Sequence, residues 1–351
     1  MQISYKNSLL TSIKPVVHYK IKVKIYDKKL CNMLIMSKLR LIQGLKIISV
    51  MHNFKANFDK VFNIIKPLVL DCINIHDNFI HSNRTPKLSD LQLVTINLVS
   101  EYMSMGSENL LFKKLKDDKT HNLDQLIERS VYNKRRRKLL PFIEIVRHRL
   151  SEKFTQFENY FIIDSMPLEI CKNARAPRIK ICKEDFDTMP DYGYCASQKQ
   201  HYFGYKLHGV CTSEGVFTAI DITKASVHDI HVLQDVRTQL SDCVLLGDKG
   251  YISSEIQLDL FHSQNIRLEV PKRENQEGAK NYPYVFRKTR KRIETQLSQL
   301  CDQFTIRINF AKTFEGFKTR ILSKITAMTL IQYINKFVNN NPINYLKHAI
   351  C

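Results

Sequence analysis

The spacing of apolar and polar residues divides the chain into a helical part followed by a part in which strands and helices alternate. Residues 51–150 show helical periodicity. Ser89 and Gln92 have the spacing of a capping box, in which the side chain of each residue bonds the backbone of the other. Apolar residues then recur every three or four positions as far as Tyr102. We therefore predict a helix that begins after Ser89, and further helices over 107–115, from Ser130 and over 142–150.

From residue 156 the pattern changes to short apolar runs that are typical of buried strands. The runs 203–210 and 216–222 flank Glu214-Gly215, a turn signal, and predict a hairpin. The other predicted strands are 161–163, 243–246 and 266–270, and the predicted helices are 227–240, 253–262 and 285–302, with a polar loop over 272–279. Strands that alternate with helices in this way indicate an α/β (α+β) fold, a mixed sheet flanked by helices and preceded by a small all-helical domain.

Composition indicates a class of partner. The 351 residues carry a net charge of +20, with 44% hydrophobic and 25% charged residues, which is typical of a globular protein with a polyanionic partner. A basic surface without such a partner is the alternative. Nine cysteines without a CxxC motif indicate reduced thiols, and no apolar run approaches 18 residues, so we expect no membrane partner.

Residues 1–50 differ from the rest of the chain. They contain ten Lys or Arg residues and one acidic residue, Asp27. No persistent helical or strand period runs through them. One interpretation is a basic arm that binds DNA. The other, which we favour, is an atypical extension upstream of a natural start at Met51, so that 1–50 is not part of the native protein.

Three acidic residues are the candidates for chemistry. Asp164 follows the apolar run of the first strand, and Asp248 follows another and is flanked by Gly247 and Gly250. Glu294 borders the apolar stripe of the predicted helix 285–302. Each has an ordinary alternative, a turn residue for either aspartate and a surface ion pair for Glu294. Together they could hold two Mg²⁺ ions about 3.5–4 Å apart, the arrangement used for phosphoryl transfer on nucleic acids.

Basic residues near these acids and in the helical part are candidates for phosphate contacts. In the segment 172–206 they alternate with tyrosines, a pattern that suits DNA backbone contact and base stacking or, equally, a solvated loop. The basic run in the helix from Ser130 has a solvated helix face as its alternative. The predicted DNA-binding residues are Lys134, Arg135, Arg136, Arg137, Lys199, Lys249, Arg287, Arg290 and Lys291.

Several motifs, in their order along the chain, resemble the bacterial insertion-sequence DDE transposases, in particular the insertion sequence 982 family. The resemblance covers about residues 51–351 and leaves out 1–50. The motifs are Pro86-Lys87-Leu88-Ser89, Arg129-Ser130 to Arg137, Phe161-Ile162-Ile163-Asp164-Ser165, Cys171-Lys172-Asn173, Tyr205-Lys206-Leu207-His208, Ala225-Ser226-Val227-His228-Asp229, Gly247-Asp248-Lys249-Gly250-Tyr251, Arg292-Ile293-Glu294-Thr295, Ser298-Gln299-Leu300 and Pro342-Ile343-Asn344.

The resemblance implies an RNase H-like catalytic domain over 156–335, after a DNA-binding helical domain over 51–155 and before a tail over 336–351. It implies catalytic and metal-binding roles for Asp164, Asp248 and Glu294, with Mg²⁺ as cofactor and Mn²⁺ as a substitute. The implied activity is cleavage of the ends of the element's own DNA and joining of the freed 3′-hydroxyl to target DNA. Double-stranded DNA is the implied partner, bound by a homodimer or larger assembly in the bacterial cytoplasm, at the nucleoid.

The sequence departs from a pattern common among such enzymes, Y-x2-R-x3-E-x6-K. Arg290 and Glu294 fit it, but Arg287 stands at the Tyr position and Cys301 at the Lys position. Two rival functions stay open. One is an RNase H-like nuclease without strand transfer, and the other is a decayed, non-catalytic copy that still binds the element ends.

Overall fold

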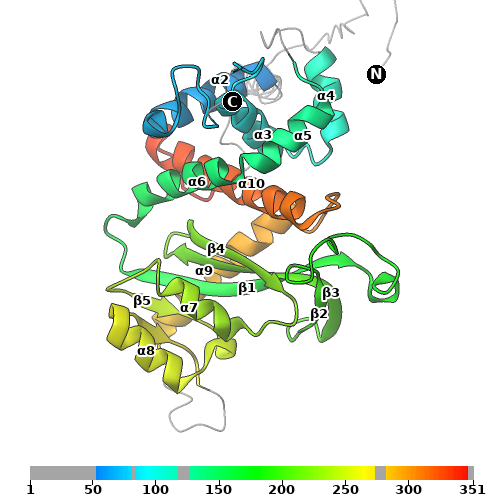
Figure 1. Cartoon of the computed structure of the whole chain (residues 1–351). Helices are drawn as coiled ribbons and strands as arrows, with labels where there is room; N and C mark the ends of the chain where they lie inside the picture. Colours follow the sequence, from blue (N-terminus) through cyan, green and yellow to red (C-terminus); the bar gives the residue numbers. More distant parts are fainter. Residues whose placement is uncertain (1–52, 81–83, 118–125, 273–281, 347–351) are drawn as a thin grey trace, which may run out of the picture. The chain divides into compact units, whose positions relative to one another are not determined.

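The computed structural model describes residues 53–80, 84–117, 126–272 and 282–346, all within the compact unit formed by 50–351 (Figure 1). The predicted extension over 1–50 and most of the predicted loop over 272–279 lie outside the described residues.

Helices make up most of the described residues before the first strand, as the apolar periodicity predicts. At the start of α3, Gln92 N donates to Ser89 Oγ (3.1 Å) and Ser89 N donates to Gln92 Oε1 (2.9 Å), so the predicted capping box is present. The helices are α2 (Phe54–Leu68), α3 (Asp90–Tyr102), α4 (Glu108–Asp117), α5 (Arg129–Lys138) and α6 (Leu140–Thr155).

A single mixed sheet follows. β3 pairs antiparallel with β1, β2 and β4, and β5 and β6 continue the sheet parallel to β1. The predicted hairpin corresponds to β3 and β4, and the predicted α/β fold class is confirmed, with the strand arrangement of an RNase H-like sheet. The strands are β1 (Tyr160–Cys171), β2 (Asp191–Cys195), β3 (Gln200–Thr212), β4 (Phe217–Lys224), β5 (Val244–Leu246) and β6 (Arg267–Glu269).

The two faces of the sheet contact different helices (Figure 1). Ile163 of β1 packs with α7 (Leu233–Val236) and α8 (Ser254–Gln264) in one core cluster. Its neighbour Ile162 faces the opposite way and packs in a second cluster with α9 (Tyr284–Asp302). This alternation is expected of a strand that is buried on both faces.

The predicted helix over 227–240 is wrong in its length. Only a short turn, η4 (Asp229–Val232), and α7 form there. The carbonyl oxygen of Val227 accepts a hydrogen bond from Lys206 Nζ (2.8 Å), and the ring of His228 caps the N–H of Ile230 (3.4 Å). Because these contacts use the backbone groups of a first turn, the helix starts later than the apolar pattern predicts.

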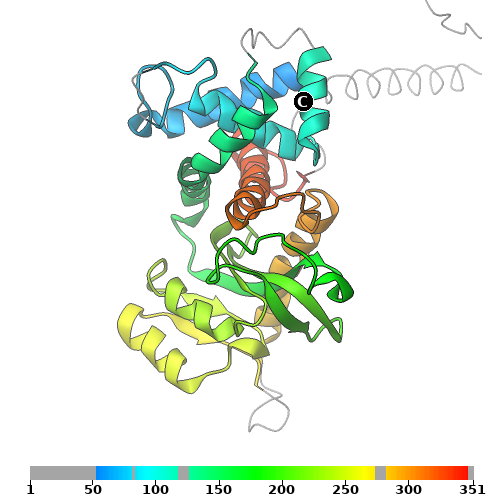
Figure 2. The ribbon, with the colours of Figure 1, turned by 45° about the vertical axis from the view of Figure 1, so that its right-hand side comes forward.

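A twenty-residue helix, α10 (Phe314–Tyr333), lies between the sheet and the N-terminal helices (Figure 2). It packs on α3, α5 and α6 as well as on α9 and β4, and nearly every residue from Gly316 to Gln332 is buried. A helix that is buried all round has no polar face, which explains why apolar periodicity gives no signal for it. One continuous core therefore joins the helices to the sheet.

Candidate active site

The sequence predicts that the first strand ends before Asp164. In the structure, Asp164 instead lies within β1, which continues to Cys171. Parallel pairing with β5 stops at Ile162 and Leu246, whereas antiparallel pairing with β3 continues past Asp164 and Gly209 to Cys171 and Phe203. The polar residues after Ile163 stay in the strand because β3 supplies their backbone partners. Asp164 thus lies two residues beyond the point where β5 ends.

Asp248 lies at the corresponding position just beyond the end of the neighbouring strand β5. It follows Leu246 by two residues, as Asp164 follows Ile162, and those two apolar residues are partners in register. The carboxylate of Asp248 accepts the N–H of Gly250 (2.7 Å) and starts the turn η5 (Lys249–Tyr251). The alternation of side chains then places both aspartates on the α9 face of the sheet.

Glu294 is on the helix that covers this face. The neighbouring Ile293 and Leu297 are buried against the sheet, as the predicted apolar stripe requires, and the side chain of Glu294 is exposed. The charge of Glu294 contributes to the raised pKa of Asp164, so the two groups are within electrostatic range. The structure therefore brings α9 and its glutamate to the same side of the sheet as the two aspartates.

The environment of Asp164 opposes its ionisation. Burial raises the pKa of this carboxyl to about 6, and the charges of Asp248 and Glu294 act in the same direction. The backbone N–H of Ser165, which donates to Asp164 Oδ1 (2.8 Å), and the charge of Arg290 lower this pKa. Crowded carboxylates of this kind are stabilised by a cation between them.

Two buried polar atoms near Asp164 have no hydrogen-bond partner among the described residues. They are Arg290 Nε and Tyr251 Oη. Arg290 lowers the pKa of Asp164, and the charges of Asp164 and Asp248 contribute to the raised pKa of Tyr251, so both groups lie in the electrostatic field of the aspartates. Buried donors without partners are uncommon and often mark a site that a ligand completes.

No three or more His, Cys, Asp or Glu side chains in the described ranges are arranged closely enough to hold a metal ion. The chemistry of the acids nevertheless fits a hard divalent cation, which prefers carboxylate oxygens. Two further observations favour a bound cation. Asp164 and Asp248 lie at corresponding positions along the sheet, and burial opposes the ionisation of Asp164. The exposed side chain of Glu294 is free of the packing that fixes its neighbours, and its rotation could complete a ligand set.

Asp164→Asn is expected to stabilise the metal-free protein at neutral pH. The pKa of this carboxyl is about 6 in the folded state against 3.8 unfolded, so the folded state alone keeps the proton between these values. Ionisation of Asp164 therefore lowers stability progressively as pH rises from about 4 to 6. The full penalty above pH 6 is roughly 3 kcal/mol. Urea unfolding in EDTA should show that the free energy of unfolding of the variant exceeds that of the natural protein by an amount that grows from about pH 4 to pH 6. A difference that does not change with pH would contradict this prediction.

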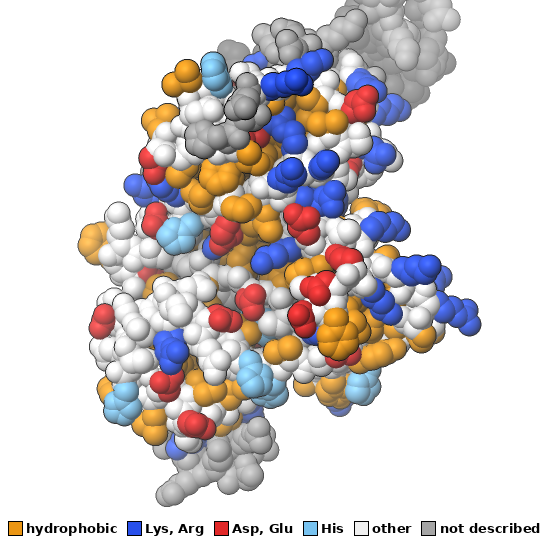
Figure 3. All heavy atoms as spheres, viewed as in Figure 1, with side chains coloured by type: hydrophobic (Ala, Val, Ile, Leu, Met, Phe, Trp, Pro, Cys, Tyr) orange, Lys and Arg blue, Asp and Glu red, His pale blue; other side chains and the backbone are white. Residues whose placement is uncertain are grey.

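The predicted DNA-binding residues divide into two groups. Lys and Arg side chains gather along one side of the face shown in Figure 3, over the helices and over the region of β2 and β3. Five predicted residues are exposed, and Arg290 is partly buried. The exposed five are Lys134, Lys199, Lys249, Arg287 and Lys291.

The arginines of the basic run in α5 have structural partners instead. Arg136 is only 3% exposed and pairs with Glu108 (2.7 Å), and Arg135 pairs with Asp90 (2.6 Å). Arg137 lies 3.9 Å from Glu315 of α10. A run of five basic residues covers every side of a helix, so part of it must face the protein. Arg135 and Arg136 thus contact acids of the protein itself, and the DNA contacts predicted for this run stay predictions.

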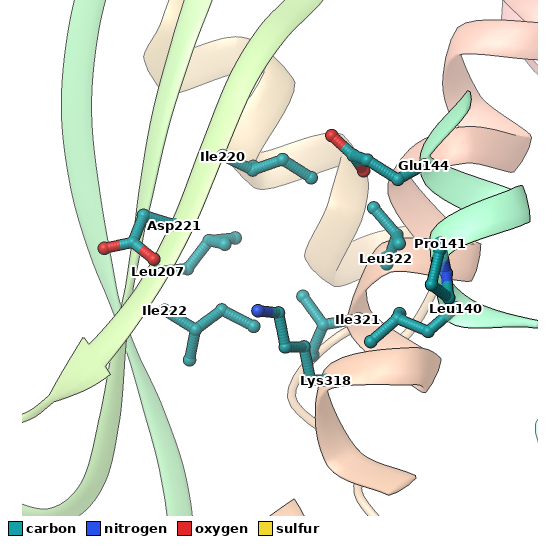
Figure 4. Close-up of a pocket in the computed structure, with 10 residues that line it drawn as sticks. All are labelled: Leu140, Pro141, Glu144, Leu207, Ile220, Asp221, Ile222, Lys318, Ile321 and Leu322. Carbon is teal, nitrogen blue, oxygen red and sulfur yellow. The ribbon is translucent and has the colours of Figure 1, made fainter. Parts of the chain in front are cut away.

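A cavity of about 320 Å³ lies between the sheet and the helices, and neither Asp164 nor Asp248 lines it (Figure 4). Leu207, Ile220 and Ile222 line it from β3 and β4, and Ile321 and Leu322 from α10. None of the predicted site residues lines it. Besides these apolar residues, Glu144, Asp221 and Lys318 line the cavity.

Three polar residues meet beside Asp164, of which only Lys206 was predicted to be functional, as one of the basic residues of 172–206. Asp229 accepts hydrogen bonds from Ser165 Oγ (3.1 Å) and Lys206 Nζ (2.6 Å). Each lies in a motif of the resemblance described above, which is the signal that could have identified it. Periodicity alone gives no such signal, because these residues come together only through the sheet.

Comparison with known protein families gives a match over the strand-containing part of the chain. Residues 155–330, half of the chain, match the family model described as "Transposase DDE domain". No curated protein sequence matches the chain. Among solved structures, "Mos1 transposase paired-end complex with left transposon end" is similar, with 11% identity over 73% of this chain and 82% of that one, and a TM-score of 0.21. No helix of the described residues is long and apolar enough to cross a membrane. The family match shows that the chain belongs to the DDE transposase domain family, whose members act in DNA recombination and the movement of mobile elements.

Proposed function

We propose that this protein is the transposase of an insertion sequence of the 982 type. It cleaves DNA at the ends of its element and joins the freed 3′-hydroxyl to target DNA. Asp164, Asp248 and Glu294 bind the divalent ions of the reaction, Mg²⁺ or Mn²⁺. The observation that best supports this proposal is the position of the two acids in the sheet. Asp164 and Asp248 each follow by two residues the paired positions Ile162 and Leu246 of the parallel strands β1 and β5, on which the helix that carries Glu294 packs.

The reaction consists of two displacements at phosphorus. In the first, the oxygen of water bonds to phosphorus and the bond to the 3′ oxygen breaks, which leaves a 3′-hydroxyl on the element. In the second, that hydroxyl bonds to a target phosphorus, displaces a 3′ oxygen of the target strand and loses its proton. Asp164, Asp248 and Glu294 would hold a pair of divalent ions, which would supply activation of the attacking oxygen and stabilisation of the leaving oxygen.

The chain's own residues hold the acids and the DNA in place. The Gly250 N–H fixes one carboxylate oxygen of Asp248, and the Ser165 N–H fixes one of Asp164. The unpartnered Arg290 Nε is suited to a phosphate oxygen of the bound strand. Exposed basic residues supply phosphate contacts outside this centre, namely Lys134, Lys199, Lys249, Arg287 and Lys291.

The biological unit in this proposal is a homodimer or larger assembly that holds two element ends together. Its substrate is double-stranded DNA at the bacterial nucleoid, in the cytoplasm. The net charge of +20 supports a polyanionic partner.

A strand-joining assay tests the proposal. Labelled DNA carrying the element ends is incubated with the purified protein, Mg²⁺ and a target plasmid. We expect joined products from the natural protein and a loss of at least about 100-fold with Glu294→Gln, since a carboxylate ligand is removed. Glu255→Gln, at an exposed position in α8, is the matched control and should join normally.

The products distinguish the remaining functions. Cleavage without joining would identify a nuclease and contradict the proposed transposition. DNA binding with neither product would identify a non-catalytic copy. Joining that survives Glu294→Gln would remove this glutamate from the active site.

A further inference from the structure

Asp229 contacts the strand β1, which carries Asp164, and its neighbour β3. Its carboxylate accepts one hydrogen bond from β1 and one from β3, through Ser165 Oγ (3.1 Å) and Lys206 Nζ (2.6 Å). Ser165 directly follows Asp164 in β1, but its side chain points to the opposite face of the sheet. Asp229 is therefore attached to β1 from behind the proposed metal site.

The same carboxylate lies against the turn that holds Asp248. A Cβ atom placed on Gly250 would be 3.5 Å from Asp229 Oδ2 and 2.9 Å from Asp248 Oδ1. Gly250 thus leaves room for both acids around one backbone position, while its N–H binds Asp248. A side chain at Gly250 would force Asp248 or its turn to shift.

Lys206 fixes the position of Asp229. Its ammonium group donates to Asp229 Oδ1 and also to the carbonyl oxygen of Val227 (2.8 Å), which anchors the start of η4. Both side chains are largely buried, with 15% of Lys206 and 21% of Asp229 exposed. Because its two oxygens are occupied by Ser165 and Lys206, Asp229 is placed to orient other ligands rather than to bind the ion itself.

We infer that Asp229 is a positioning residue, which holds the Asp164 segment of β1 and the Asp248 turn at the separation that metal binding requires. This inference rests on the proposed function and adds a residue to it. Residues behind metal ligands orient them, and their loss typically costs about 10- to 100-fold in metal affinity or activity. A residue that merely starts η4 would affect folding stability and leave metal affinity unchanged.

Mn²⁺ binding to the full chain, followed by electron paramagnetic resonance without DNA, separates these roles. Asp229→Asn should raise the dissociation constant about 10- to 100-fold. When cleavage of labelled element-end DNA is measured, the Mg²⁺ concentration that gives half the maximal rate should rise by a similar factor. The cleavage rate should recover at high Mg²⁺. Asp235→Asn, an exposed acid on the following helix α7, is the matched control and should bind Mn²⁺ normally. Binding by Asp229→Asn within twofold of the natural protein would overturn the inference.

Two further variants keep the result interpretable. If Asp229→Asn does not fold, Ser165→Ala removes one contact alone and should weaken Mn²⁺ binding at least threefold, and no change would overturn the inference. Asp164→Asn tests the proposed function separately. If Asp164→Asn abolishes Mn²⁺ binding and Asp229→Asn does not weaken it, only the positioning role is lost. If Asp164→Asn leaves Mn²⁺ binding and cleavage intact, the proposed metal site itself fails.

Discussion

Replacing Asp248 with Asn is expected to reduce Mg²⁺-dependent cleavage of element-end DNA at least about 10³-fold, a barrier increase of about 4 kcal/mol. Asn retains the acceptor for the Gly250 N–H, so the turn η5 should persist. What is lost is a negative charge at the level of Asp164, where the acids are already crowded. The effect should therefore be on metal binding and chemistry rather than on folding.

The initial rate of cleavage of labelled end DNA in Mg²⁺ measures this effect. Asp242→Asn is the matched control, because Asp242 is exposed and precedes the same strand β5. Its positive φ of 50° is a conformation that Asn also tolerates. The control should cleave normally. Cleavage by Asp248→Asn within tenfold of the natural rate would remove Asp248 from the reaction.

Lys324→Met is expected to destabilise the fold by about 3–5 kcal/mol, the usual cost of leaving one member of a buried ion pair alone. Lys324, in α10, is 2% exposed and donates to Glu101 Oε2 (2.6 Å) and to the carbonyl oxygen of Phe304 (2.7 Å). Without it, the charge of Glu101 in α3 stays buried without its cation. Burial lowers the pKa of Lys324 and the charge of Glu101 raises it, so each group depends on the other.

Urea unfolding at neutral pH measures this cost. The double variant Lys324→Met with Glu101→Leu removes both charges and should recover most of the stability, since apolar replacement of a buried pair is often neutral or stabilising. Lys318→Met, in the same helix but without a buried partner of this kind, is the control. A loss below 1 kcal/mol in the single variant would show that water reaches this pair.

The sequence predicts elements best where local chemistry determines them. The capping box of Ser89 and Gln92 gives the start of α3 correctly, and the apolar stripe from Ile293 identifies α9. Elements that depend on contacts with residues far away in the sequence are predicted less well. The extension of β1 past Asp164 depends on β3, and the length of the helix after Val227 depends on Lys206. The short strand β2, an edge strand paired only with β3, has no apolar signature.

The candidate site follows the same division. The sequence shows that Asp164, Asp248 and Glu294 can provide oxygen ligands. Only the register between β1 and β5 shows that the two aspartates lie at corresponding positions along the sheet. The sequence gives no means to separate Arg136, which pairs with Glu108, from Lys134, which is exposed, because both belong to one basic run. Asp229 likewise gains its contacts only when β1, β3 and η4 are assembled.

The central claim is that Asp164, Asp248 and Glu294 bind the divalent ions of the reaction. The most direct test is the position of Mn²⁺, located by its anomalous X-ray scattering in crystals of the protein bound to element-end DNA. We predict Mn²⁺ in contact with the carboxylates of Asp164 and Asp248, with Glu294 turned toward the same ions. Mn²⁺ bound elsewhere, or a Glu294 carboxylate that stays in solvent when the DNA is in place, would contradict the claim.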